Sequence, residues 1–123
     1  MDSSRALTLA FAAGRGLFGV GLVAAPGRLA SGWLPDDHER PQTQIALRGI
    51  GGRDIALAGG TVAAAINGGD ARPWLLSAIA ADGSDIAAAF LAGDRLPARA
   101  KYGTLALAGV AVACGVALVA AES

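Results

Sequence analysis

Charged residues are scarce in this chain, and so are the residue types that usually carry metal and redox chemistry. Asp, Glu, Lys and Arg make up 16% of the 123 residues and balance to a formal net charge of zero. The single cysteine, Cys114, excludes a disulfide within one chain. The single histidine, His38, falls in a polar stretch, which gives no support for haem or a histidine-based metal site in an apolar segment. No basic cluster interleaved with aromatic residues occurs, which argues against nucleic acid as a partner.

Apolar residues, in contrast, are abundant. They make up 54% of the chain, and its mean hydropathy is +0.50, a composition that fits a lipid solvent better than water. Four apolar segments each approach the roughly 20 residues needed to span hydrocarbon; they cover residues 6–25, 45–66, 74–93 and 102–121. Because the connections after the second and third segments are short, we expect one all-α domain over residues 1–123, an integral membrane up-down four-helix bundle.

The first segment also has one feature of a secretory signal, because Arg5 precedes its apolar run. Arg15 argues against this alternative, since it places a charge in the middle of that run. We therefore expect the segment to be retained as a membrane span.

The basic residues predict an orientation. Lys and Arg in short loops favour the cytoplasmic side. Five lie in the loops after the first and third segments, namely Arg28, Arg40, Arg95, Arg99 and Lys101, whereas the N-terminus and the middle loop carry only Arg5 and Arg72. This asymmetry predicts a multi-pass protein of the inner (plasma) membrane with both termini extracytoplasmic.

Ionisable residues in the middle of three segments are the most unusual feature. They are Arg15, Arg53, Asp54, Asp82 and Asp85. A charge at the centre of a membrane helix costs roughly 2.5 to 3.5 kcal/mol on insertion scales. Counted from the predicted cytoplasmic ends, the five charges reach similar depths, within roughly 5 Å at the helical rise per residue. We therefore expect them to form one ion network.

Helix geometry limits the pairings in this network. Asp82 and Asp85 share a helix face, whereas the neighbours Arg53 and Asp54 point about 100° apart and are expected to need different partners. We predict that Asp54 pairs with Arg15 and that Arg53 reaches Asp82 or Asp85. One carboxylate then remains, and Arg48 either balances it or extends to the headgroups.

Small residues repeat at four-residue steps in three segments and predict close helix crossings. The steps comprise Gly52, Ala56, Gly60 and Ala64 in the second segment, Ala80, Ser84, Ala88 and Ala92 in the third, and Gly109, Ala113, Ala117 and Ala121 in the fourth.

The run from Ala46 to Leu57, which includes Arg48, Arg53 and Asp54, resembles a family of small actinobacterial four-helix membrane proteins of unknown function, loosely similar to the DoxX-like proteins. The residues 72–76 and 81–85 extend this resemblance into the third segment. It implies the four-helix fold and carries no established activity. A redox role, as linked to DoxX-like relatives, would need a cysteine pair that this chain lacks.

Catalysis finds little support in these residues. Ser77 and Ser84 have no histidine or lysine base at a plausible depth, and two carboxylates are too few for a closed metal site. We therefore expect a protein without catalytic residues, metal or cofactor, embedded in the lipid bilayer as a homo-oligomer or as a structural or accessory subunit of a larger membrane complex. The alternative is a small proton-coupled transporter or membrane binding protein for a polar or anionic ligand, in which Asp82 or Asp85 exchanges a proton.

Overall fold

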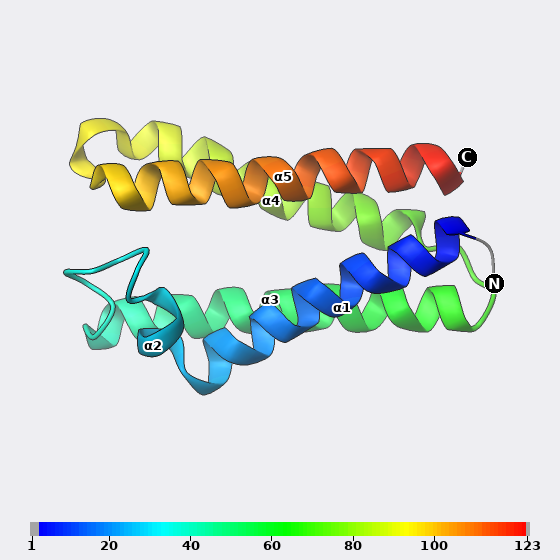
Figure 1. Ribbon diagram of the computed structural model, residues 1–123, viewed down its shortest axis with the longest axis horizontal. Coiled ribbons are helices and arrows are strands. Elements are labelled where there is room, and N and C mark those ends of the chain that lie inside the picture. The colour runs from blue at the N-terminus through cyan, green and yellow to red at the C-terminus, as the bar shows by residue number, and fades with distance from the viewer. Residues whose placement is uncertain (1–2, 123) are drawn as a thin grey trace. The chain divides into compact units, whose positions relative to one another are not determined.

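The computed structural model describes residues 3–122, and every regular element in that range is a helix. The elements are α1 (Ser3–Ala24), α2 (Pro26–Ala30), α3 (Pro41–Ile66), α4 (Arg72–Ala92), the short 3-10 helix η1 (Gly93–Arg95) and α5 (Ala98–Glu122) (Figure 1). The predicted all-α class is therefore confirmed. The chain divides into two compact units, one ending at Gly69 and one beginning at Asp70, and each is described by itself.

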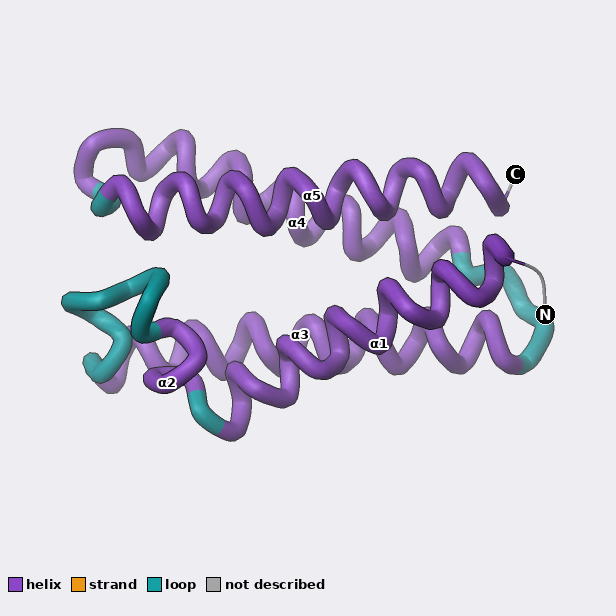
Figure 2. The backbone as a smooth tube through the Cα atoms, in the orientation of Figure 1, coloured by secondary structure: helices purple, strands orange, loops and turns teal. Residues whose placement is uncertain are grey.

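The four long helices begin earlier than the apolar segments predict. Each starts two to four residues before the predicted span. Proline occupies the first turn of α3 and of α4, as Pro41 and Pro73, where its fixed φ favours helix and its missing N–H costs nothing. Short loops connect α3 to α4 and η1 to α5, whereas a longer loop over residues 31–40 connects α2 to α3 (Figure 2). Hydropathy locates the lipid-compatible part of a helix, whereas proline and turn residues locate its ends.

Three helices are long and apolar enough to cross a membrane, namely α1, α4 with η1, and α5. The helix α3 is 26 residues long but does not reach the same apolar threshold among the described residues. Arg53, Asp54 and its five glycines lower its apolar character. Three of the four predicted spans are therefore long and apolar enough to cross a membrane, whereas the second predicted span, residues 45–66, is not among them.

The first unit is a helical hairpin in which α1 and α3 pack along each other (Figure 1). The buried residues of its two long helices lie in steps of three, four or seven: Thr8, Ala12, Gly19 and Leu22 on α1, and Leu47, Gly51, Asp54, Ala58, Thr61 and Ala65 on α3. This is the heptad spacing of two helices wound around each other. The small residues at four-residue steps on α3, which begin with Gly52 and Ala56, were predicted to form a helix contact. This prediction is wrong for this hairpin, because Gly52 and Ala56 are exposed. A strict four-residue step drifts off such a seam, whereas a heptad follows it.

The closest approach of α1 and α3 occurs where two glycines meet. A Cβ atom added to Gly19 would lie 2.6 Å from the carbonyl oxygen of Gly51, and one added to Gly51 would lie 2.6 Å from that of Gly19. Neither position has room for a side chain. Backbone contact of this kind is typical of membrane helices, whose association depends on close van der Waals packing.

The connection between α1 and α3 folds over one end of this hairpin. Leu22, Ala30 and Leu47 form a buried apolar cluster there, and Trp33 and Leu34 pack against it. The short helix α2 carries Leu29, and Trp33 lies in the turn that follows it. The loop is held by its own backbone, and His38 Nδ1 lies 2.9 Å from the carbonyl oxygen of Leu34. A buried apolar cluster beneath a polar loop therefore lies at this end of the hairpin.

The second unit is a hairpin of α4 and α5. Most of its buried residues lie at heptad spacing, namely Leu75, Ala78, Asp82 and Ala89 on α4 and Ala108, Gly115 and Leu118 on α5, whereas the buried Ala100 at the start of α5 lies outside this spacing. The tightest contact involves Gly115, where an added Cβ would lie 2.8 Å from Ile79 Cγ1. The predicted ladders of both helices lie off this seam, since Ala80, Ala88, Ala113 and Ala117 are exposed.

The segment before α4 carries a surface ion pair. Arg72 Nε and Nη2 donate to the two carboxylate oxygens of Asp70, each over 2.9 Å, and the Arg72 backbone N–H donates to Oδ1 over 3.0 Å. These hydrogen bonds hold the pKa of Asp70 below its ordinary value of 3.8. Because the pKa is lowered on folding, any stabilisation is present above the ordinary pKa and is lost as the pH falls through the folded-state pKa.

We expect Arg72→Gln to raise the pKa of Asp70 toward its ordinary value. A carbon-detected NMR titration of the Asp70 carboxyl in detergent micelles measures this shift. Arg99→Gln, an exposed arginine at the start of α5, is the control and should leave the titration unchanged. An unchanged midpoint in Arg72→Gln would show that the hydrogen bonds do not persist in solution.

Candidate functional site

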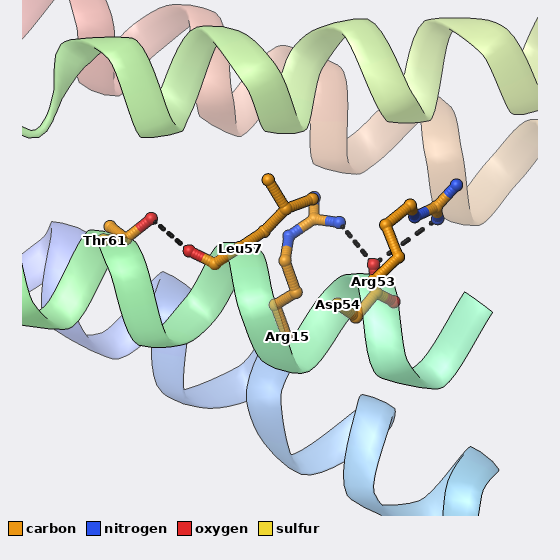
Figure 3. A network of polar contacts seen from close by, with 5 residues as sticks. All are labelled: Arg15, Arg53, Asp54, Leu57 and Thr61. Atoms are coloured by element: carbon orange, nitrogen blue, oxygen red, sulfur yellow. Dashed lines mark hydrogen bonds and ion pairs between the residues drawn. The ribbon is translucent and has the colours of Figure 1, made fainter. Parts of the chain in front are cut away.

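The candidate site is an ion cluster in the seam of the first hairpin (Figure 3). Arg15 of α1 and Asp54 of α3 occupy seam positions one heptad step from the Gly19–Gly51 contact. Arg15 Nη1 donates to Asp54 Oδ1 over 3.0 Å. The side chains are 9% and 5% exposed, so this ion pair is buried. The predicted pairing of Arg15 with Asp54 is confirmed.

Arg53 also reaches the same carboxylate. Its Nη2 atom lies 3.4 Å from Asp54 Oδ1, at the long end of hydrogen-bond distances, and its side chain is 32% exposed. The expectation that these neighbours cannot pair is therefore wrong. The two Cβ atoms do point apart, but the guanidinium stands on a long flexible stem and can turn back along the helix (Figure 3). One carboxylate thus receives two guanidinium groups.

An aromatic ring completes the surroundings of Arg15. The guanidinium carbon lies 5.6 Å from the centre of the Phe11 ring, one helical turn earlier on α1. A cation over such a ring gains about 0.5 to 2 kcal/mol, with the larger values for desolvated groups. Sequence reasoning missed Phe11, although its spacing of four residues from Arg15 places both on one helix face. Arg15 is therefore held both by charge and by an aromatic contact.

Arg48 hydrogen-bonds to the backbone of α1, a contact that differs from the predicted balancing of a carboxylate in the ion network. Its Nε donates to the carbonyl oxygen of Val23 over 3.1 Å, and the residue is exposed. Val23 lies in the last turn of α1, where carbonyl groups lack partners within the helix. Arg48 therefore ties the start of α3 to the end of α1, about a turn and a half away from Asp54.

The two acidic residues of α4, Asp82 and Asp85, lie on one face of that helix. Asp82 is 5% exposed and Asp85 is partly buried. Both interact electrostatically or through hydrogen bonds. The Lys and Arg residues of this hairpin, Arg72, Arg95, Arg99 and Lys101, all lie at helix ends. The predicted pairing of Arg53 with Asp82 or Asp85 stays a prediction, because these residues belong to different units.

The described residues offer few side chains for metal binding or nucleophilic chemistry. Within residues 3–122, no three His, Cys, Asp or Glu side chains lie close enough to hold a metal ion. The Ser77 hydroxyl donates to the Pro73 carbonyl oxygen over 2.8 Å, and the Thr61 hydroxyl donates to the Leu57 carbonyl oxygen over 2.7 Å (Figure 3). Hydroxyl groups in apolar helices commonly bond to their own backbone in this way. Cys114 is exposed and reduced.

Comparison with known proteins adds no family to this picture. No protein-family model, no curated protein and no solved structure matches the chain. The candidate function therefore depends on the residues and their geometry.

Proposed function

We propose that this chain is a non-enzymatic integral membrane protein, a structural or accessory subunit whose intramembrane Arg/Asp network holds its helices in register. One observation carries the proposal: the buried ion pair between Arg15 and Asp54 joins two helices inside their packed seam. Both residues lie at the heptad positions where α1 and α3 contact each other. An ion pair that fixes the register of two helices is expected at such positions.

The wider arrangement that we propose is an up-down four-helix bundle in the plasma membrane, with both termini extracytoplasmic. The charges support it. The middle of the first hairpin holds two guanidinium groups around one carboxylate, and the middle of the second holds Asp82 and Asp85. Opposite charges at similar depth in lipid stabilise helix association. The resemblance to small actinobacterial four-helix proteins, in the run around Arg53 and Asp54, agrees with this arrangement.

Neutralising the second hairpin's acids tests the structural role. We expect Asp82→Asn and Asp85→Asn, each purified in detergent, to lower the melting temperature or to weaken assembly measured by size-exclusion chromatography with light scattering. The reason is that an ion network with one partner removed leaves a desolvated charge. If both variants match the unsubstituted protein in melting and assembly, the structural role is wrong.

A second candidate, a proton-coupled transporter or binding protein, is favoured by one observation. Asp82 and Asp85 lie three residues apart on one face of α4. In vesicles containing a pH-sensitive dye, this candidate predicts proton flux that Asp82→Asn or Asp85→Asn abolishes without lowering the melting temperature. The structural role predicts the reverse pattern.

A further inference from the structure

The turn between α4 and α5 gathers basic side chains at one end of the second hairpin (Figure 1). Arg95 lies in η1, and Arg99 and Lys101 lie in the first turn of α5. Over residues 93–101, Asp94 is the single acid. Among residues 3–122, no ion pair joins any of these three basic side chains to a carboxylate. The turn therefore presents positive charge that the described part of the chain does not neutralise.

The stability of the two helices explains only one of these basic residues. Arg95 Nη2 and Nε lie 3.4 Å and 3.5 Å from the carbonyl oxygens of Leu91 and Ala92, and a cation is favourable at the C-terminal end of a helix such as α4. Arg99 and Lys101 instead lie at the N-terminal end of α5, where the helix dipole favours acidic residues. The first turn of α5 has none. An anion from outside the chain would relieve this arrangement of like charges.

Exposed apolar side chains lie next to the basic ones, farther from the turn along each helix. Phe90 and Leu91, near the end of α4, are 63% and 80% exposed, and Tyr102 of α5 is 65% exposed. Tyr102 follows Arg99 by three residues, so both lie on one face of α5. Basic groups at a helix end, followed by aromatic and apolar groups one turn deeper, match the headgroup and acyl regions of a phospholipid. A small soluble anion would use the charges alone.

The opposite end of the same hairpin lacks this excess of basic charge. Arg72 is paired there with Asp70, and α5 ends at Glu122. Uncompensated basic charge in this hairpin is thus confined to the turn, so an anionic ligand is expected at that end only.

We infer that the α4–α5 turn binds the headgroup of an anionic phospholipid, with Arg99 as the phosphate contact and Tyr102 beside the acyl chain. The planar guanidinium of Arg99 offers paired donors to a phosphate, while Arg95 and Lys101 add attraction at short range. This inference rests on the proposed membrane placement and deepens it, because it names the class of lipid that one turn selects.

Native mass spectrometry of the full chain in neutral detergent tests the inference. Phosphatidylglycerol is expected to bind more tightly than phosphatidylcholine with the same acyl chains. Arg99→Gln combined with Lys101→Gln should weaken phosphatidylglycerol binding by about fivefold for each charge removed, hence roughly 25-fold for the pair. Inorganic phosphate at the same concentration should not displace the lipid.

The matched control is Arg28→Gln combined with Arg40→Gln, which removes two exposed arginines from a region that also carries Asp36, Asp37 and Glu39. It should change lipid binding by less than about twofold, because acids already compensate those charges. Without added lipid, both double variants should melt like the unsubstituted protein, since neither removes a buried contact.

Several outcomes would overturn the inference: equal binding of the two lipids, equal weakening in the two double variants, or displacement by phosphate. A lower melting temperature of the Arg99→Gln, Lys101→Gln variant without lipid would also overturn it, because these residues would then serve folding. If the lipid preference is absent while Asp54→Ala still destabilises the protein, the structural role of the ion network stands and only the lipid assignment fails.

Discussion

Gly51→Leu is expected to separate α1 from α3 and to lower the free energy of unfolding by about 3 kcal/mol. Even the first side-chain carbon at this position would lie 2.6 Å from the Gly19 carbonyl oxygen and 2.9 Å from Leu22 Cβ. Neither obstacle is the free end of a flexible chain, so the helices themselves must move. Thermal or chemical unfolding in detergent, followed by circular dichroism, measures the loss.

The neighbouring glycine provides the control. An added Cβ at Gly52 meets no atom within 4 Å, and leucine is a better helix former than glycine. We expect Gly52→Leu to unfold like the unsubstituted protein or at slightly higher temperature. Equal losses in both variants would mean that helix propensity or lipid contact, and not the Gly19–Gly51 approach, governs stability here.

Asp54→Ala is expected to cost about 3 to 5 kcal/mol, because it removes the acceptor and leaves a buried guanidinium without its carboxylate. Arg15 is the residue most affected, since its side chain is 9% exposed. Replacing both partners, as in Arg15→Leu with Asp54→Leu, should recover much of the loss, since an apolar pair can fill a buried seam without a desolvated charge. Equilibrium unfolding of the single and double variants measures both effects.

The control for Asp54→Ala is the removal of a carboxylate that lies outside the helices. Asp36 lies exposed in the loop before α3, and Asp36→Ala should change stability by no more than about 0.5 kcal/mol. If Asp54→Ala behaved like Asp36→Ala, the buried ion pair would not contribute to stability, and the proposed role of the network would lose its main support.

Counting depth along the apolar segments was enough to predict the Arg15–Asp54 pair. That count needs only the rise of a helix and the position of its ends, which composition supplies within a few residues. The relation of Arg53 to Asp54 was missed because it depends on where a long side chain turns, which the directions of Cβ atoms do not determine. The contact of Phe11 with Arg15 cannot be predicted from the pattern of charged residues, because an apolar ring at helical spacing is equally typical of ordinary packing.

The contact glycines show a different limit of sequence reasoning. Small residues are so frequent here that several stripes fit equally well, and Gly51 and Gly52 are indistinguishable by composition. The two glycines differ in their contact with the partner helix. Because α3 winds around α1, only positions at steps of three and four along α3 face α1, and Gly51 is one of them. The buried face of α3 is therefore a property of the pair rather than of either helix alone.

The buried pair also bears on how the chain enters a membrane during its synthesis. The helix α3 is the one long helix in residues 3–122 that does not reach the apolar threshold on its own, and Asp54 is one of the residues that lower it. Arg15 of α1 compensates the charge of that carboxylate inside the hairpin, together with Arg53 of α3 itself. In the membrane placement that we propose, α3 is therefore expected to enter lipid together with α1, as one hairpin.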